Sequence, residues 1–280
     1  MKNEAAKEKI GFGALLVATL VIVVPVILIV GLIIARGFGA LSWEFLFTMP
    51  RDGMKAGGIF PAIVGTFILV VTSIAFALPI GVMAAVYLHE YARENLLTRI
   101  INLAIINLAG VSSVVFGLFG FSLFVIFLKF GVSITAGALT LGIMTLPVII
   151  TTTREALRAV PQSYREVSFS LGASRWQTVR HAVLPFATPG ILTGAILSVG
   201  RVAGETAPIL FTVAAFYLPR LPHSLSDQVM ALPYHLYIST TQIPNVPESY
   251  RYGTALVLVG LVLVVNVAAV ILRGKMRRRK

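Results

Sequence analysis

Residues 166–185 read EVSFSLGASRWQTVRHAVLP, and they close a polar segment that runs from Arg154 to Pro185 between two long apolar stretches. The segment is too long for a simple connection and too polar to enter a lipid bilayer. Pro161 and Gly172 predict that it divides into short helices joined by turns. This stretch is therefore expected to fold outside the membrane, between two spans of the chain.

The helical pieces of this segment are expected to be amphipathic. Leu171, Trp176, Val179 and Val183 form an apolar stripe, while the charged residues face water. Ser163, followed three residues later by Glu166, predicts a capping box for the second piece. The apolar side needs a partner, which is either a separate protein or the spans of the chain itself.

The composition of the whole chain supports a membrane protein. Of its 280 residues, 57% are hydrophobic and 12% are charged, whereas soluble domains are near 45–50% apolar and about 25% charged. The mean hydropathy is +0.91. A soluble globule of this size cannot hide so much apolar surface. These values exclude disorder, a collagen-like fibre and a soluble enzyme.

The apolar runs predict a single all-α domain over residues 1–280 with six membrane spans, each of about 20 residues or more. The first is too long for the apolar region of a cleavable signal peptide, so we expect it to be retained. The third and fifth are long enough to be tilted, kinked or partly outside the bilayer. The six spans are 10–35, 59–87, 100–128, 134–150, 186–216 and 253–272.

The basic residues sort by side of the membrane. The chain has 23 Lys and Arg against 11 Asp and Glu, a net charge of +12. Between the predicted spans, 16 of the basic residues fall on one side and 6 on the other, and Arg201 falls within a span. The positive-inside rule then places both termini and the loop 151–185 in the cytoplasm, and the loops 36–58 and 217–252 outside. The tail Arg277 to Lys280 is explained by membrane topology and contact with lipid headgroups, without nucleic acid.

The sequence shows no site for a catalytic group, a metal or a nucleotide. There is no cysteine, and the four histidines are scattered over different loops. His89 and Glu90 do not begin an HExxH zinc site, because Arg93 stands where the second histidine is needed. There is also no GxxxxGK[ST] motif for ATP. We expect no cofactor on this chain, and any ATPase must be another polypeptide.

Arg201 and Glu205 are the second feature that points to function. A charge in the middle of a membrane costs at least about 2.5–3.5 kcal/mol, so it marks a functional site by default. Spaced i, i+4, the two side chains are expected to pair along one face of the fifth span. The small residues Gly190, Gly194 and Gly204 are expected on or near that face, where another helix can approach closely. The pair is either a structural ion pair or a polar gate whose arginine binds an oxyanion through its fork of donors.

Segment 166–185 resembles the cytoplasmic loop of binding-protein-dependent ABC importer permeases, written E-A-A-x3-G-x9-I-x-L-P. Glu166, Gly172, Leu184 and Pro185 fall at the matching positions, while Val167, Ser168 and Ala182 depart from the pattern. The resemblance implies a coupling helix around Ser168–Trp176 that docks into a cleft of a separate ATPase. The residues expected to carry this coupling are Glu166, Ser170, Leu171, Gly172, Ala173 and Trp176.

Further strings resemble the phosphate-specific permeases of the PstA type. GRVAGETAPILF surrounds Arg201, AGVSSVVFGLFGF begins at Ala109, IMTLPVII begins at Ile143, and LSDQVMALPYHLYI begins at Leu225. Two positions differ from many relatives: Ser112 stands where proline is common, and Thr151 stands where an arginine is expected.

The resemblance implies a MetI-like permease of a type I ABC importer for inorganic phosphate, working by alternating access in a bacterial or archaeal inner membrane. It implies a heterodimer with a PstC-type permease and two PstB-type ATPases that use ATP-Mg. A PstS-type phosphate-binding protein would dock on loops 36–58 and 217–252. The alternatives are a permease for another oxyanion such as molybdate or sulfate, and a stand-alone channel, secondary carrier or intramembrane enzyme. The last class would not need a cytoplasmic docking segment, nor does the chain show the paired groups that an intramembrane hydrolase needs.

Overall fold

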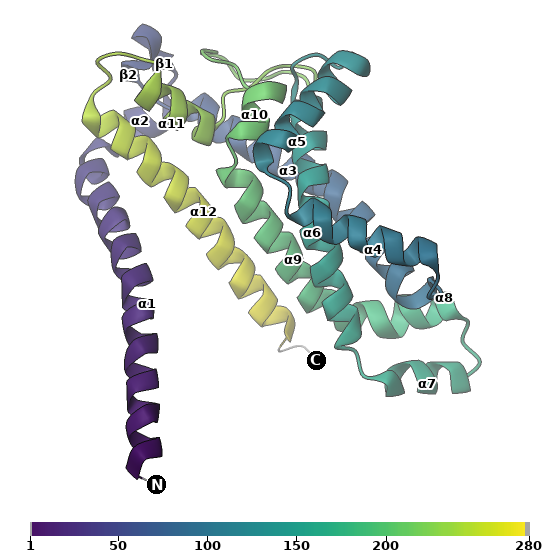
Figure 1. Ribbon diagram of the computed structural model, residues 1–280. Helices are drawn as coiled ribbons and strands as arrows, with labels where there is room; N and C mark the ends of the chain where they lie inside the picture. The colour runs from purple at the N-terminus through teal and green to yellow at the C-terminus, as the bar shows by residue number, and fades with distance from the viewer. Residues whose placement is uncertain (1, 278–280) are drawn as a thin grey trace.

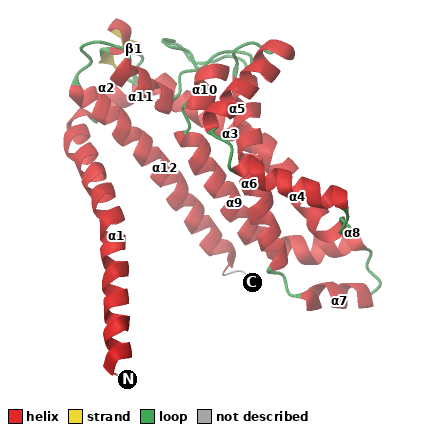
Figure 2. Cartoon of the chain, viewed as in Figure 1, coloured by secondary structure: helices red, strands yellow, loops and turns green. Residues whose placement is uncertain are grey.

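The computed structural model describes residues 2–277, and most of them lie in helices (Figures 1 and 2). Arg278, Arg279 and Lys280 of the basic tail lie outside the described residues. The only strands in the described part are β1 (Pro50–Arg51) and β2 (Ala56–Gly57), a short antiparallel pair in which Pro50 lies opposite Gly57. The all-α prediction is confirmed.

Within residues 2–277, five helical stretches are long and apolar enough to cross a membrane, and a sixth crossing results if one bent pair of helices counts as a span. The long helices are α1 (Lys2–Gly37), α3 (Phe60–Val86), α6 (Ile134–Arg158), α9 (Leu184–Gly204) and α12 (Glu248–Arg277). A π-helical turn, Tyr87–Tyr91, extends α3, and the turns α8 (Arg175–Thr178) and Val179–Val183 lead directly into α9.

The third predicted span is not one helix. Residues 100–128 divide between α4 (Leu96–Ala109) and α5 (Ser113–Gly120), which a π-helical turn extends through Phe127. The two pieces meet at an angle of 107°. Gly110 ends α4 and Ser112, in extended conformation, precedes α5. Each piece is shorter than the roughly 20 residues that a crossing needs, so only the pair together can carry the chain across.

The fifth predicted span is also interrupted. Within residues 186–216, α9 ends at Gly204 and a short helix, α10 (Ala207–Thr212), follows. Pro208 lies in the first turn of α10, where its missing N–H costs nothing. The backbone is extended at Glu205, directly after α9. The break thus falls directly after the charged pair Arg201 and Glu205.

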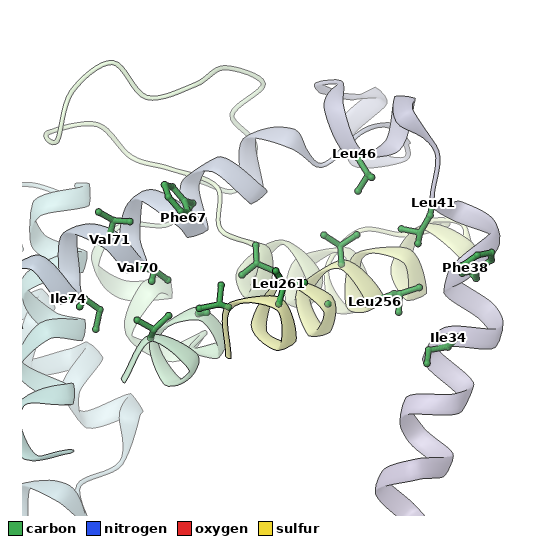
Figure 3. A pocket seen from close by; sticks show the side chains of 16 residues that line it. Ile34, Phe38, Leu41, Leu46, Phe67, Val70, Val71, Ile74, Leu256 and Leu261 are labelled. Carbon is green, nitrogen blue, oxygen red and sulfur yellow. The ribbon is translucent and has the colours of Figure 1, made fainter. Parts of the chain in front are cut away.

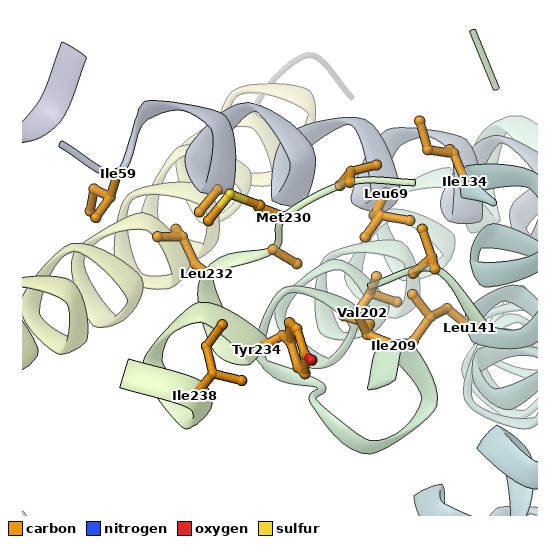
Figure 4. Close-up of a cluster of buried hydrophobic side chains, with 14 of the residues drawn as sticks. Ile59, Leu69, Ile134, Leu141, Val202, Ile209, Met230, Leu232, Tyr234 and Ile238 are labelled. Atoms are coloured by element: carbon orange, nitrogen blue, oxygen red, sulfur yellow. The ribbon is translucent and has the colours of Figure 1, made fainter. Parts of the chain in front are cut away.

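The core is built where α3, α6 and α9 pack against one another. Small residues permit the approach: Gly142 of α6 lies against the ring of Phe76, and Gly81 of α3 lies against Ile149. Figure 4 shows part of this core, with Leu69 and Leu141 near Ile209 and Val202. By contrast, the apolar stretch of α1 is fully exposed, as expected of a helix surrounded by lipid.

The molecule has two ends of different character (Figure 1). One end, which we call the basic end, holds the start of α1, the helix α7 (Gln162–Ser170) and α8. The other, the loop end, holds the short helix α2 (Trp43–Phe47), the two strands and α11 (Leu232–Thr241). The remaining short turns at the loop end are Phe38–Ala40 and Asp52–Met54.

The loop end is ordered by specific hydrogen bonds. The carboxylate of Asp227 accepts the backbone N–H of His223 at 2.8 Å and of Ser224 at 3.1 Å, and these bonds lower the pKa of Asp227. Nε2 of the fully buried His235 lies 3.2 Å from the hydroxyl of Tyr250, which donates to the carbonyl of Gly58 at 3.4 Å. These contacts join α11, the start of α12 and the segment before α3.

Candidate functional site

The polar segment forms two helices joined by a tight turn at the basic end. Gly172 has a φ of +81°, a conformation that glycine adopts without steric cost. The turn is closed by backbone hydrogen bonds, from Gly172 to the carbonyl of Phe169 at 2.9 Å and from Ala173 to that of Ser168 at 3.1 Å. The predicted division of the segment at Pro161 and Gly172 is confirmed, because α7 lies between them.

The capping box lies elsewhere than expected. Pro161, not Ser163, occupies the N-cap position of α7, so Ser163 and Glu166 form no capping box. The box forms at α8 instead, where Ser174 and Gln177 exchange side-chain to backbone hydrogen bonds. This box fixes the direction in which the chain leaves the turn.

The predicted apolar stripe divides into two sets. Val179 and Val183 are buried in the molecule, whereas Leu171 is 83% exposed and Trp176 is 56% exposed. The exposed set continues on α7, where Tyr164, Val167 and Phe169 also reach the surface. Part of the stripe thus packs against the chain's own spans, and part remains on the surface. We call the exposed side chains the exposed apolar patch: Tyr164, Val167, Phe169, Leu171 and Trp176. Tyr164, Val167 and Leu171 line one hollow beside His181, whereas Trp176 lies over the end of α3 beside Met83 and Tyr87.

The polar residues of the predicted coupling segment lie around this patch. Glu166 and Ser170 are exposed, and the hydroxyl of Ser170 donates to the backbone carbonyl of Glu166 at 2.9 Å. Ala173 is half-buried. The structure brings these residues together on the basic end, and their role in contacting an ATPase stays a prediction.

Sequence reasoning missed a buried ion pair beneath α7. Arg165 and Glu90 form two hydrogen bonds, Nη2 to Oε1 at 2.6 Å and Nε to Oε2 at 3.3 Å. Their side chains are only 10% and 13% exposed. The two residues are far apart in sequence and belong to different elements, so spacing could not pair them. The available signal was a carboxylate, Glu90, at the end of an otherwise apolar span.

Arg201 and Glu205 are in contact, although not on one helical face. Nε of Arg201 lies 3.5 Å from Oε1 of Glu205. Arg201 is in the last turn of α9, but Glu205 is the residue that ends the helix and its backbone is extended. The two side chains are 33% and 17% exposed. No hydrogen-bond partner of Nη1 or Nη2 of Arg201 lies among residues 2–277, so these nitrogens are available to another group.

The three glycines expected near this pair differ in their surroundings. Gly190 lies against the side chain of Ala156, and Gly194 lies against Thr152, so both bring α9 close to α6. Around Gly204 there is open space instead. The expected packing role therefore does not extend to Gly204. Thr151, where relatives were expected to carry an arginine, donates its hydroxyl to the carbonyl of Pro147 within α6 at 2.7 Å.

An apolar pocket of about 920 Å³ lies between α1, α3, α9 and α12 (Figure 3). Every residue that lines it is apolar, among them Phe67 and Val71 of α3 and Leu256 and Leu261 of α12. A charged ligand needs hydrogen-bond donors or opposite charge, which this pocket lacks. Arg201 and Glu205 do not belong to its lining.

Comparison with known proteins gives a consistent result. Residues 77–280 match the family model described as the binding-protein-dependent transport system inner membrane component. The chain is 35% identical over 269 residues to the phosphate transport system permease protein PstA 1 of Mycobacterium tuberculosis (strain CDC 1551 / Oshkosh), covering 93% of this chain and 86% of that protein. It is 34% identical to the probable ABC transporter permease protein YqgI of Bacillus subtilis (strain 168), covering 95% of each.

A solved structure supports the fold. A chain of a bacterial ABC transporter involved in the import of the acidic polysaccharide alginate superposes with a TM-score of 0.67, covering 97% of this chain and 98% of that chain. The identity is 14%. The arrangement of helices is thus that of an ABC importer permease.

Proposed function

Since this chain belongs to the binding-protein-dependent transport system inner membrane component family, we propose that it is the permease subunit of an ATP-driven importer for inorganic phosphate. Members of such a system work with an ATPase and a substrate-binding protein, and the chain is a multi-pass integral membrane protein. The observation that carries the substrate assignment is the Arg201–Glu205 pair, read together with the PstA relatives that match almost the whole chain.

The geometry of Arg201 suits an oxyanion. Its Nη1 and Nη2 have no partner within the described residues, and they lie at the break between α9 and α10, beside the open space at Gly204. A guanidinium presents two parallel donors that match two oxygens of a phosphate. Glu205 would hold Arg201 in position, and its carboxylate would accept a hydrogen bond from a protonated phosphate hydroxyl. Sulfate, which lacks that hydroxyl near neutral pH, would be repelled.

The exposed apolar patch provides the contact with the ATPase. Leu171 stands at the tip of the turn with nothing from its own chain covering it, and Trp176 stands nearby on α8. Large apolar side chains left in water mark interaction sites. In this proposal they dock into a cleft of a PstB-type ATPase, of which the complex contains two copies, and those copies bind ATP-Mg. This chain contributes no ATPase site.

The remaining partners follow from the topology we propose. The basic end faces the cytoplasm with both termini, and the loop end faces the outside of an inner membrane, as the distribution of Lys and Arg favours. A PstS-type binding protein would then deliver phosphate to the loop end. A PstC-type permease would complete the pathway, with Arg201 facing the shared interface.

Transport assays with the assembled complex in lipid vesicles test the proposal. Replacing Arg201 with Met should abolish ATP-driven uptake of labelled phosphate while leaving the complex assembled. Arg158 supplies a matched control, because it also pairs with a glutamate, Glu155, at 3.1 Å, but at the exposed end of α6. Arg158→Met should retain uptake. Unchanged uptake in the Arg201 variant would contradict the assignment.

Competition assays separate phosphate from the other oxyanions. Wild-type uptake of phosphate should resist an excess of sulfate or molybdate. Glu205→Gln should reduce this discrimination, because the repulsion of a fully deprotonated anion is lost. If sulfate or molybdate is the better substrate of the wild-type complex, the alternative importer is the correct one.

A further inference from the structure

The buried pair Glu90–Arg165 is not explained by either docking or substrate binding. Arg165 is buried beneath α7, whereas the side chains of the exposed apolar patch lie on the surface. The two hydrogen bonds of the pair, at 2.6 and 3.3 Å, use both oxygens of the carboxylate and two nitrogens of the guanidinium. Such a forked, charge-assisted contact fixes the relative orientation of its two partners as well as their distance.

The same guanidinium also holds the end of α6. Nη1 of Arg165 donates to the carbonyl of Val160 at 3.1 Å, and Nη2 donates to the carbonyl of Leu157 at 3.2 Å. Carbonyls at the last turn of a helix have no partner within the helix. Arg165 adds a charged donor to the Leu157 carbonyl, which also accepts the backbone N–H of Val160 at 3.2 Å, and to the Val160 carbonyl just after α6. A single side chain thus joins α7, the end of α6 and the turn that extends α3.

Arg165 is the one buried residue of α7. The other side chains of this helix lie at or near the surface, and five of them flank or form the exposed apolar patch. Apart from the covalent chain, α7 is attached to the rest of the molecule through Arg165, through the ring of Tyr164, whose centroid lies 5.1 Å from that of Phe186 on α9, and through the hydroxyls of Ser168 and Thr178, which lie 2.9 Å apart.

The region that receives Arg165 is a compact apolar cluster. It unites the end of α3, the end of α6 and the start of α9 through Val86, Leu157, Val160, Val179, Val183 and Ala187. Because close-packed side chains transmit displacement rather than absorb it, a force applied to α7 reaches α3 and α6 through Arg165. It reaches α9, which carries Arg201, through the link to Thr178 and through the contact of Tyr164 with Phe186.

We propose that the Glu90–Arg165 pair is the joint that makes α3 and α6 follow α7 when the ATPase moves it. This inference rests on the proposed function, since it assumes that α7 is driven by an ATPase. Both residues act through position rather than by touching the substrate. Loss of the pair should leave ATP hydrolysis running without a matching movement of the membrane helices.

The experiment uses the full complex in vesicles and measures ATP hydrolysis and phosphate uptake in the same sample. Glu90→Gln and Arg165→Met should lower the phosphate transported per ATP hydrolysed by about tenfold, a factor typical of coupling between two sites. Arg165→Lys keeps the charge but cannot hold both carbonyls and the carboxylate at once, so it should fall between these variants and the wild type. The ATPase should co-purify with all three.

A matched control is available at the same end of α6. Glu155 and Arg158 form an ion pair at 3.1 Å, but within one helix and with side chains 68% and 66% exposed. Glu155→Gln and Arg158→Met change the charges in the same way and should leave the coupling ratio unchanged. Equal loss in the control pair and the buried pair would overturn the proposal. So would an unchanged ratio in the buried pair, or loss of the ATPase from both Glu90→Gln and Arg165→Met.

A distance measurement separates this inference from the substrate assignment. Because the chain has no cysteine, spin labels can be attached only at introduced cysteines, one at Gln162 on α7 and one at Met83 on α3. In the wild type the distance between the labels should stay the same with and without ATP, and in Glu90→Gln it should change or broaden on ATP binding. If the wild-type complex hydrolyses ATP but moves no phosphate, the substrate assignment fails and this distance still decides the role of the joint.

Discussion

Nη1 of Arg154 lies 2.7 Å from Oδ1 of Asn102, so a side chain of α6 holds α4 by a hydrogen bond to a charged group. The helix α4 buries none of its residues, which makes this contact a large part of its attachment. Asparagine side chains within spans can form hydrogen bonds between helices, and Asn102 does so here.

Asn102→Ala should therefore loosen α4 without unfolding the core. The lost bond to a charged group is worth roughly 1.5–3 kcal/mol. Hydrogen–deuterium exchange should become faster in residues 96–109 and stay unchanged in α6. Asn107, which is exposed on the same helix, provides the control, and Asn107→Ala should leave exchange as in the wild type. Equal exchange in both variants would rule out the anchoring role.

Gly172 offers a test of the turn at the tip of the coupling segment. The methyl group of an alanine at position 172 would meet no neighbouring atom, so the substitution destabilises the turn only through its backbone conformation. With a φ of +81°, this destabilisation is roughly 1–2 kcal/mol for an ordinary residue and less for asparagine. Binding of the ATPase should decrease in the order Gly, Asn, Ala, measured by co-purification or by affinity in detergent. An alanine variant that binds as well as the wild type would show that the turn is not needed.

Two glycines of α9, Gly194 and Gly204, allow the packing of that helix to be tested by comparing two substitutions. Gly194→Ala places a methyl group against the side chain of Thr152 and should destabilise the protein by about 1–3 kcal/mol. Gly204→Ala meets open space and should be tolerated, because no packing contact is disturbed. Thermal unfolding in detergent measures both. A larger loss for Gly204→Ala would contradict the observed contacts.

The burial of His235 makes the stability of the folded protein depend on pH. Its burial lowers its pKa from the ordinary value of 6.5 to about 4. Between these two values the unfolded chain binds a proton that the folded chain does not, so stability is lost as the pH falls from about 6.5 to about 4. The loss amounts to about 3 kcal/mol for this group. In a series of melting temperatures, His235→Gln should flatten this part of the curve.

Tyr250→Phe is the control for that measurement. It removes the hydroxyl that lies 3.2 Å from His235 but keeps the ring buried. Since burial and not the hydrogen bond lowers the pKa of His235, this variant should be less stable at every pH while keeping the wild-type slope. A flat curve in Tyr250→Phe would assign the pH dependence to another group.

Hydropathy predicted the long helices well because a span must be apolar along its whole length. It could not detect the bend at Gly110 to Ser112, since apolar residues continue on both sides and the backbone alone changes direction. Pro208 alone did not predict the break before α10, because α9 itself continues through Pro189. The i, i+4 spacing predicts a pair on one helical face only if the helix continues through Glu205. Instead, α9 ends at Gly204, and the backbone of Glu205 is extended.

The site was predictable to the extent that its residues are neighbours in the chain. The turn at Gly172 and the contact of Arg201 with Glu205 follow from local spacing. The partner of Arg165 does not, because pairing across different helices depends on how α3 and α6 pack. For the same reason the apolar stripe could not be divided in advance into Val179 and Val183, which the chain itself buries, and Leu171, which it leaves exposed.

The exposure of Leu171 has a consequence for a copy of the chain that has not yet met its partners. Such a copy presents a leucine, a tryptophan and a phenylalanine to water on a pair of short helices, where they favour aggregation over solubility. Synthesis of the permease in excess of the ATPase would then be harmful to the cell. The exposed surface would therefore require that the cell produce the two subunits in balanced amounts and remove unassembled copies by proteolysis.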